Sequence, residues 1–460
     1  MIPSHPSFTN YEVIGRGSSA TVYKATYTPT NMQVSLKSVF NTNDPEIREE
    51  TMQEINIHRS LDHPFIVSYY GSYEANDQTV IVMEFVKCMS LLDSVNQTGS
   101  LQEFDAQRIF CQLVSAVKYL HVVKKVAHRD LKLENILITY QRNIKLIDFG
   151  FAHVNVNVLK TQCASIPYAA PEIFKGEEYT ESVDIWSLGV ILYAMLTGEL
   201  PFGDGDIVSI ASKVLGGPPK YPDTLSESSR DLISKMLEID QTKRLNIEQV
   251  EMHPWTQMTR FALLIKQDII CPPEILVNPT TDFDQSVIRT MERVGVNTSG
   301  MTLENFNEKD TETSMSYRII KKCLMFPVYQ KVLQAAVFPK QTVNSAMVMP
   351  QKVSRLPNIY SPGENKNLLQ DSQNLQTASM FLPAPILQKP TGKKVNLPLK
   401  NKAKVMFGSS DAGLLFNSLG IKTRMKSMPN GGEDNDLLQT VTRSNYTLPS
   451  ISMFSGLKKT

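Results

Sequence analysis

Residues 128–135 read His-Arg-Asp-Leu-Lys-Leu-Glu-Asn, and residues 148–150, which begin 13 positions after this segment ends, read Asp-Phe-Gly. Transfer of a phosphoryl group needs a metal ion on the phosphates, a group that orients the attacking hydroxyl, and positive charge near the moving phosphoryl. A chance polar loop is the alternative interpretation, but two such segments at this separation argue against it. The candidate groups are Asp130 as the base, Lys132 as the positive charge, and Asn135 and Asp148 as oxygen ligands of Mg²⁺.

A glycine-containing turn lies near the start of the chain, where residues 14–22 read Ile-Gly-Arg-Gly-Ser-Ser-Ala-Thr-Val. Glycines at Gly15 and Gly17 let backbone N–H groups approach a phosphate closely. Taken alone, such a turn is more often an ordinary hairpin. Lys37 ends an apolar strand that follows, and it could reach a phosphate or simply mark an exposed strand edge. Glu54, in a helical pattern, is its candidate partner or a solvated charge.

Other short segments predict local structure around these groups. Asp44 followed by Pro45 is typical of a helix start, and the helical pattern of 51–61 continues from it. The short apolar run at 144–147, just before Asp148, predicts a strand.

Together these segments resemble a eukaryotic protein kinase, and the resemblance covers residues 11–257. Later landmarks of that family follow in the same order. They are the Ala-Pro-Glu triplet at 170–172, Asp-Ile-Trp-Ser-Leu-Gly at 184–189, Arg244, and His-Pro-Trp at 253–255.

The resemblance implies a fold, a cofactor set and a role for individual residues. The fold is α+β and bilobal, with a β-rich lobe at about 11–86 and a helical lobe after it, and ATP and Mg²⁺ bind between the lobes. The implied catalytic residues are Asp130, Lys132 and Asn135; the implied ATP-binding residues are Ile14, Gly15, Gly17, Val22, Lys37, Glu54, Glu84 and Val86; the metal ligands are Asn135 and Asp148; and Glu172 and Arg244 form a structural ion pair.

The resemblance extends to a subgroup. Lys132, two residues after Asp130, is typical of serine/threonine protein kinases. Residues 159–165 are similar to the activation loop of AMP-activated and microtubule-affinity-regulating kinases, which belong to the calcium/calmodulin-dependent kinase group. That similarity makes Thr161 the activating phosphosite, although an ordinary loop hydroxyl is the alternative. A phosphate there could pair with Arg129, the arginine beside the catalytic aspartate.

Several positions depart from the pattern of these relatives. Residues 88–90 read Cys-Met-Ser where relatives usually have Gly-Gly-Glu, and residues 164–167 differ along the stretch that meets the substrate. These departures motivate an alternative, a pseudokinase or scaffold that binds partners without turnover. A kinase for small molecules is a weaker possibility, because such enzymes lack the segments at 170–172 and 184–189.

The formal charge of +1 divides unevenly along the chain. Residues 325–460 hold 17 Lys and Arg against 6 Asp and Glu, a net +11, so residues 1–324 carry −10. The same stretch, 325–460, holds 11 prolines and shows no sustained periodicity. Such a composition buries too little apolar surface to offset chain entropy, so we expect a basic, disordered tail over 325–460.

A small helical module is expected between the kinase-like region and this tail. An apolar stripe from Val287 to Val294 ends at Gly295, and two shorter helical patterns follow, around 301–306 and 313–320. This pattern over 284–322, after a linker at 272–282, is similar to the ubiquitin-associated-like segment of AMP-activated kinase relatives. Any small helical extension would show similar periodicity.

Length and composition indicate the number of structural units, the cellular location and the partners to expect. At 460 residues and 42% apolar, the chain suggests two or three soluble units, and no apolar run is long enough to span a membrane. Five scattered cysteines and the lack of a visible signal peptide favour a cytoplasmic protein, with the nucleus as an additional location. The expected partners are a protein substrate and an upstream activating kinase, with no specific nucleic acid. The basic tail could contact acidic surfaces, although a solvated linker is the simpler interpretation.

Overall fold

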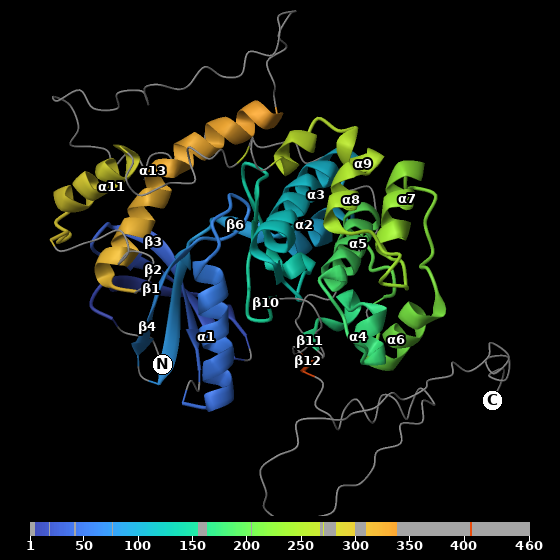
Figure 1. Cartoon of the computed structure of the whole chain (residues 1–460), viewed down its shortest axis with the longest axis horizontal. Coiled ribbons are helices and arrows are strands. Elements are labelled where there is room, and N and C mark those ends of the chain that lie inside the picture. The colour runs from blue at the N-terminus through green and yellow to red at the C-terminus, as the bar shows by residue number, and fades with distance from the viewer. Residues whose placement is uncertain are drawn as a thin grey trace, which may run out of the picture.

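The protein has a small lobe built on a β-sheet and a larger lobe built of helices, as the computed structural model shows in Figure 1. This is the α+β bilobal arrangement expected from the sequence. The structure describes residues 5–17, 19–40, 43–75, 77–154, 163–203, 205–266, 270, 282–299, 310–337 and 405–406.

The small lobe is an antiparallel sheet with strand order β1-β2-β3-β5-β4. Side chains alternate across a strand, so Val34 and Leu36 of β3 point into the apolar core of the lobe. Lys37 therefore lies on the opposite face of the same strand. The strands are β1 (Phe8–Arg16), β2 (Ala20–Tyr27), β3 (Met32–Val39), β4 (Tyr69–Ala75) and β5 (Gln78–Glu84).

Helix α1 (Pro45–Arg59) packs beside this sheet and carries Glu54. The Asp44 side chain accepts a hydrogen bond from the Glu46 backbone N–H at 2.9 Å, and Pro45 occupies the first helical position. Both features suit the unpaired amides of a helix start. The helix start expected at Asp44-Pro45 is confirmed.

The large lobe is organised around α5 (Ser182–Thr197), whose residues from Val183 to Met195 are all buried. A helix that is apolar on every side belongs in the interior, and Trp186 of α5 stacks on Phe202 there with ring centroids 5.5 Å apart. The helices around it are α2 (Leu91–Thr98), α3 (Glu103–Lys118), α4 (Pro171–Lys175), α6 (Ile207–Gly216), α7 (Glu227–Met236), α8 (Ile247–Met252) and α9 (Pro254–Gln257), with a π-helical segment at Tyr119–Lys124 and 3₁₀ turns at Leu133–Asn135, Ile166–Tyr168 and Ala262–Ile265.

Short strands of the large lobe carry the loops that face the small lobe. One small sheet has the order β6-β8-β9 and another pairs β10 with β7. The strand predicted at 144–147 corresponds to β9. The strands are β6 (Cys88–Ser90), β7 (Val126–Ala127), β8 (Ile136–Thr139), β9 (Ile144–Leu146) and β10 (His153–Val154).

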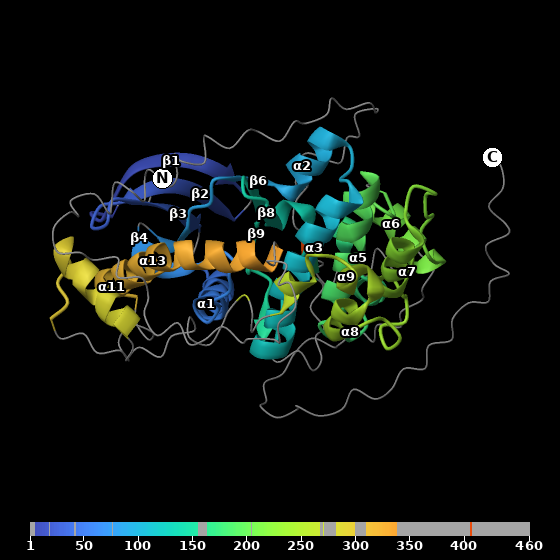
Figure 2. The same cartoon turned by 90° about the horizontal axis from the view of Figure 1, so that it is seen from above.

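Two helices follow the large lobe in the chain, α11 (Asp282–Arg293) and α13 (Glu312–Val337). The sequence predicts a helix ending at Gly295, whose φ of 84° suits a glycine, and another over 313–320. The pattern expected around 301–306 lies outside the described residues, as does the linker at 272–282 apart from its last residue. Figures 1 and 2 both show α13 running along the small lobe toward the large one.

The expectation of disorder from residue 325 onward is wrong for residues 325–337, because α13 continues without interruption to Val337 with Pro327 inside it. Met325, Tyr329 and Leu333 recur every four residues and are buried. That apolar stripe packs against the rest of the protein. Its burial offsets the hydrogen bond that the proline cannot make.

Of the rest of the predicted tail, the structure describes β12 (Val405–Met406), which pairs antiparallel with β11 (Cys163–Ala164). The remainder of 338–460 lies outside the described residues.

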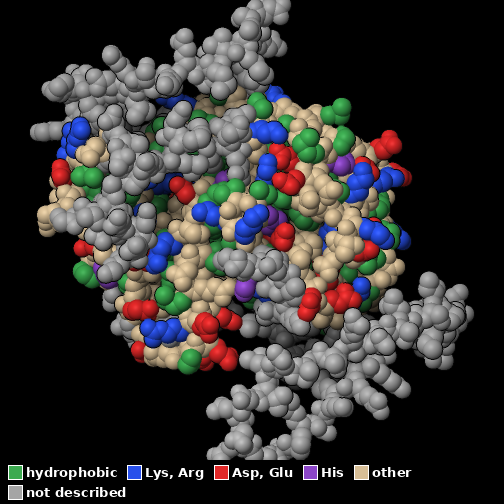
Figure 3. Space-filling model, in the orientation of Figure 1, with side chains coloured by type: hydrophobic (Ala, Val, Ile, Leu, Met, Phe, Trp, Pro, Cys, Tyr) green, Lys and Arg blue, Asp and Glu red, His purple; other side chains and the backbone are tan. Residues whose placement is uncertain are grey.

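On the face drawn in Figure 3, Lys and Arg side chains lie among Asp and Glu side chains. Among the described residues, none of the helices combines the length and the apolar character needed to span a bilayer.

Candidate active site

Asp184 of α5 fixes the backbone of the loop that carries Asp130. The Asp184 carboxylate accepts hydrogen bonds from the backbone N–H groups of His128 and Arg129, each at 2.8 Å. Arg129 has a φ of 67°, a left-handed conformation that costs energy in a residue with a side chain. The two hydrogen bonds to a buried carboxylate keep the loop in this shape.

The Asp184 carboxylate remains ionised in this interior. Burial alone would raise its pKa, but the hydrogen bond with His121 Nε2 at 2.8 Å and the His128 amide hold the pKa below its ordinary value. The aspartate therefore acts as a fixed negative anchor for residues 128–129.

Asp130 is buried and its carboxylate is surrounded by donors. Lys132 Nζ lies 2.9 Å from Oδ2, Asn135 Nδ2 lies 3.0 Å from the same oxygen, and the Ser165 hydroxyl donates to Oδ1 at 2.7 Å. Lys132 Nζ also donates to Ser165 Oγ at 2.9 Å. The structure thus brings together the three residues that the sequence proposes as catalytic and adds Ser165, the last residue of the segment similar to an activation loop.

Lys37, Glu54 and Asp148 meet between the two lobes. Lys37 Nζ donates to Glu54 Oε1 at 2.5 Å and to Asp148 Oδ1 at 3.1 Å. Burial alone would lower the pKa of the Lys37 ammonium, but the negative charges of Asp148 and Glu54 raise the pKa above its ordinary value. A permanently charged ammonium beside Asp148 is the group needed to position phosphate oxygens.

A row of aromatic rings in mutual contact lies next to the cluster of Lys37, Glu54 and Asp148. Phe149 lies between His128, with centroids 5.0 Å apart, and His58 of α1, at 5.1 Å. His58 in turn contacts the ring of Tyr69 on β4 at 5.6 Å. The row links the residue next to Asp148 to the helix that carries Glu54 and to the sheet.

His58 is 1% exposed and its Nε2 donates to the Val67 carbonyl at 2.8 Å. Burial lowers its pKa from 6.5 to about 4. Between these values the unfolded state binds a proton that the folded state does not, so the free energy of unfolding falls as the pH falls.

We predict that His58→Phe, which keeps a ring without a titrating group, removes about 2 to 3 kcal/mol of the stability difference between pH 7.5 and pH 4.5. Urea unfolding of both proteins at the two pH values measures this difference. Equal differences for wild type and variant would contradict the prediction.

The glycine turn joins β1 to β2. Gly15 pairs with Val22 across the two strands, and the Gly17 N–H donates to the Ala20 carbonyl at 2.8 Å. Ile14 is exposed at this edge of the sheet. The turn is thus an ordinary hairpin in its hydrogen bonding, and its position at the sheet edge is compatible with a phosphate-binding role.

Glu84 and Val86 lie in the segment that joins the two lobes. The Glu84 carboxylate accepts hydrogen bonds from Lys145 Nζ at 2.8 Å and from Ser68 Oγ at 3.1 Å. Burial would raise the pKa of this carboxyl, but the Lys145 charge holds it below its ordinary value. Because the side chain is engaged within the protein, a contribution of Glu84 to nucleotide binding would come from its backbone.

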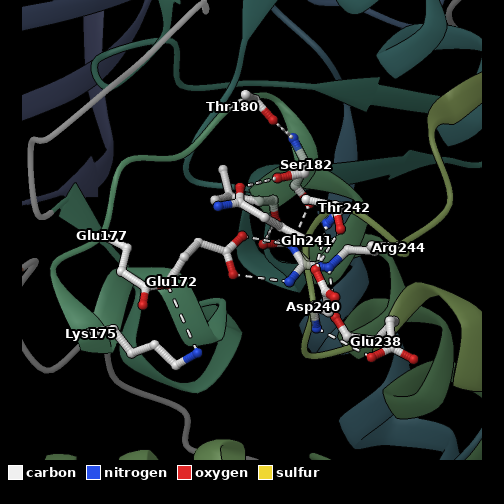
Figure 4. Close-up of polar contacts among 12 residues, drawn as sticks. Glu172, Lys175, Glu177, Thr180, Ser182, Glu238, Asp240, Gln241, Thr242 and Arg244 are labelled. Carbon is white, nitrogen blue, oxygen red and sulfur yellow. Dashed lines mark hydrogen bonds and ion pairs between the residues drawn. The ribbon is translucent and has the colours of Figure 1, made fainter. Parts of the chain in front are cut away.

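The expected ion pair between Glu172 and Arg244 is present (Figure 4). Arg244 donates from Nη1 to Oε1 at 2.6 Å and from Nη2 to Oε2 at 2.9 Å, in a bidentate arrangement. The Glu172 and Arg244 side chains are 2% and 0% exposed. Arg244 also donates to the carbonyls of Ser182 and Glu238, so it ties α4 to the start of α5.

Two features of the site do not follow from the sequence. Asp184 belongs to a recognised family segment, but its role as acceptor for the amides of residues 128–129 depends on contacts between distant parts of the chain. The hydrogen bonds of Ser165 to Asp130 and Lys132 carry no signal in the sequence either. The predicted phosphosite Thr161 lies outside the described residues.

Comparison with known proteins gives the same result as the geometry. Residues 8–256 match the model of the protein kinase domain. The chain is 35% identical over 319 residues to SNF1-related protein kinase catalytic subunit alpha KIN12 of Arabidopsis thaliana, covering 68% of this chain and 63% of that protein. It is 37% identical over 287 residues to serine/threonine-protein kinase SIK2 of Gallus gallus, covering 62% and 36% respectively.

A third relative is the carbon catabolite-derepressing protein kinase of Secale cereale, which is 35% identical over 318 residues, or 67% of this chain and 62% of that protein. The chain therefore spans between about one third and two thirds of the length of these relatives. The family model covers more than half of the chain, and the site geometry agrees with it. This chain belongs to the protein kinase domain family.

Proposed function

We propose that the protein is a serine/threonine protein kinase, which transfers the γ-phosphoryl group of ATP to Ser and Thr hydroxyls of proteins. The observation that carries the proposal is the meeting of Lys37, Glu54 and Asp148 in one ion-pair cluster, beside the hydrogen-bonded group around Asp130 in the large lobe. The three relatives described above carry kinase names. None of these observations favours the alternative of a scaffold without turnover.

Each residue has a distinct part in this reaction. Asp130 accepts the proton of the attacking hydroxyl as that oxygen bonds to phosphorus and the bond from phosphorus to the ADP oxygen breaks. Lys132, which lies 2.9 Å from the Asp130 carboxylate, offsets the charge of the transferring phosphoryl. Lys37, held by Glu54, positions the phosphates of the nucleotide.

The chemistry of Asn135 and Asp148 fits Mg²⁺. The Asn135 amide nitrogen donates to Asp130 at 3.0 Å, so its amide oxygen is the group that remains to bind a cation. Asp148 contributes a carboxylate whose Oδ1 already faces the Lys37 ammonium. Mg²⁺ prefers such hard oxygen ligands, together with phosphate oxygens and water. When bound, it would neutralise charge on the β- and γ-phosphates.

A labelling assay tests this function directly. The full chain is incubated with radiolabelled ATP, Mg²⁺ and a generic basic protein, with and without excess EDTA. We expect label on the protein substrate only when Mg²⁺ is free. Thermal unfolding with millimolar MgATP should show a higher midpoint, because a ligand that binds the native state stabilises it. Absence of both label and stabilisation would reject the proposal.

We further propose that phosphorylation of Thr161 by an upstream kinase activates the protein. The support is the similarity of residues 159–165 to the activation loops of AMP-activated kinase relatives, together with the presence of Arg129 beside the catalytic aspartate. A phosphate carries nearly two negative charges and three acceptor oxygens, which can order a loop around an arginine.

After treatment with an activating kinase, Thr161→Ala is expected to keep only its basal turnover, and Thr161→Glu to show a partial gain, because one carboxylate carries less charge than a phosphate. Phosphate-transfer rates before and after treatment measure the effect. Thr224→Ala, at an exposed threonine of the large lobe, is the matched control. Full activation of Thr161→Ala would refute the switch.

We also propose that residues 284–322 belong to a ubiquitin-associated-like module. Val287 and Met291 of α11 form a separate apolar cluster with Tyr317 and Ile320 of α13. A core of its own between these two helices supports a small module that docks on the kinase.

A further inference from the structure

The carboxylate of Asp310 lies at a junction of three elements. Asp310 immediately precedes α13, where the Thr311 hydroxyl caps the helix by accepting from the Ser314 N–H at 3.1 Å. Its side chain is 7% exposed, and four side chains donate to it. They are Arg59 at 2.5 Å, Ser72 at 2.8 Å, Arg318 at 2.8 Å and the Tyr69 hydroxyl.

These donors come from two elements of the small lobe and from α13 itself. Arg59 is in the last turn of α1, one residue beyond His58 and in the same helix as Glu54. Tyr69 and Ser72 are in β4. Arg318 is in α13 and also donates to the Tyr70 carbonyl of β4 at 2.8 Å. One carboxylate thus connects α13 to both the helix and the sheet that position Lys37 and Glu54.

The carboxylate is ionised in this setting. Burial would raise the pKa of Asp310, but the hydrogen bonds from Tyr69, Arg318, Arg59 and Ser72 hold the pKa below its ordinary value. A buried carboxylate that is fully engaged by donors is rigid, and removal of its charge leaves several donors without an acceptor.

Helix α13 also docks on the small lobe through contacts that do not involve Asp310. Met315 and Ile319 insert into the apolar core of the small lobe, and the Tyr27 hydroxyl lies 2.9 Å from Ser316 Oγ. Gly71 of β4 permits this approach, because a Cβ at that position would collide with the Met315 side chain. The apolar contacts hold the helix, and Asp310 adds a specific link from that helix to α1.

The other end of α13 reaches the large lobe. Leu333, Ala336 and Val337 belong to the apolar core of that lobe, and Arg260 Nη2 donates to the Val337 carbonyl at 3.1 Å. Figures 1 and 2 show the helix crossing from one lobe to the other. A helix anchored in the large lobe therefore supplies the fixed point against which Asp310 holds α1.

We propose that Asp310 is a positioning residue for phosphoryl transfer: through Arg59 and Tyr69 it holds α1 where Glu54 meets Lys37, which makes α13 an activating brace between the lobes. This inference rests on the proposed kinase function. Direct ring contacts connect Tyr69 to the site: Tyr69 contacts His58, and His58 contacts Phe149, the neighbour of Asp148.

The test compares two variants of the full chain that each remove one carboxylate at the start of α13. Asp310→Asn keeps the shape of the side chain but places N–H donors opposite other donors. Glu312→Gln is the matched control, because the Glu312 carboxylate accepts from Ser7 at 2.5 Å, and Ser7 is not part of α1. Two readouts are needed, steady-state kinetics and amide hydrogen exchange of residues 45–59.

We expect Asp310→Asn to lower kcat about tenfold. A change of this size corresponds to a typical interaction energy between contacting residues of one hydrogen-bond network. The KM for the protein substrate should stay unchanged, and exchange in α1 should quicken while exchange in α5 does not. Asp310→Glu should restore part of both. Kinetics and α1 exchange indistinguishable from those of Glu312→Gln would overturn the inference.

Arg59→Gln removes the other partner of the Arg59–Asp310 ion pair. This variant still tests the inference if Asp310→Asn does not fold. We expect it to reproduce the faster α1 exchange, and the double variant to lose less than the sum of the two single effects. Additive effects would overturn the link. If the wild type transfers no phosphate, the proposed function fails, whereas α1 exchange still decides whether Asp310 positions this helix.

Discussion

Asp148→Ala is expected to lower the turnover of phosphate transfer by at least about a thousandfold, while the protein stays folded. In the proposed reaction Asp148 supplies a carboxylate for Mg²⁺, and in the structure it accepts a hydrogen bond from Lys37 Nζ at 3.1 Å. Its loss would remove the proposed metal ligand and one of the two anions that orient the lysine. Because catalysis of phosphoryl transfer consists mainly of positioning and charge stabilisation, little rate enhancement remains.

The measurement is the initial rate with a generic basic protein substrate, at saturating MgATP. Asp223→Asn is the matched control, since Asp223 is fully exposed and far along the chain from the site residues. That variant should keep the wild-type rate. A rate for Asp148→Ala within tenfold of wild type would contradict the assignment of Asp148, even if Asp223→Asn behaves as expected.

Glu172→Ala is expected to be the most damaging change for stability. It leaves the Arg244 guanidinium, which is 0% exposed, without its bidentate partner. Removal of one member of a buried ion pair typically costs about 3 to 5 kcal/mol, because the remaining charge is buried and uncompensated. For a domain of this size the corresponding fall in the unfolding midpoint is about 10 °C.

Differential scanning calorimetry of the full chain measures this change. Lys235→Ala serves as the control, because Lys235 pairs with Asp231 at 2.7 Å on the surface, where both side chains are about half exposed. Exposed pairs contribute little to stability. A midpoint for Glu172→Ala no lower than that for Lys235→Ala would show that the buried pair does not brace the lobe.

The catalytic segments could be predicted from the sequence because their chemistry is local. Asp130, Lys132 and Asn135 lie close together in the chain, and their mutual contacts follow from a short loop and one 3₁₀ turn. The start of α1 could be predicted for the same reason, since the Asp44 cap acts on the residue two positions on. In these cases the residue types and their spacing are enough to predict which groups contact one another.

The role of Asp310 could not be predicted in this way. Its contacts with Arg59, Tyr69 and Ser72 join distant parts of the chain, and the sequence around it is an ordinary polar stretch. The extension of α13 to Val337 was missed for a different reason. Composition averaged over 325–460, with its 11 prolines, concealed an apolar stripe that returns at every fourth position.

His58 illustrates a third case. The sequence indicates a helix over 51–61, but nothing in it shows that a histidine would be buried between Phe149 and Tyr69. A titratable ring at that place makes the connection between α1 and residues 148–150 sensitive to acid. That consequence emerges only when a helix of one lobe is packed against a loop of the other.

Phosphoamino-acid analysis of a labelled protein substrate tests the central claim most directly. The wild-type chain and Asp148→Ala are each incubated with radiolabelled ATP, Mg²⁺ and a protein that contains Ser, Thr and Tyr, and the labelled product is hydrolysed to amino acids. We predict phosphoserine and phosphothreonine with the wild type and neither with Asp148→Ala. Phosphotyrosine alone, or equal labelling by the two proteins, would contradict the account.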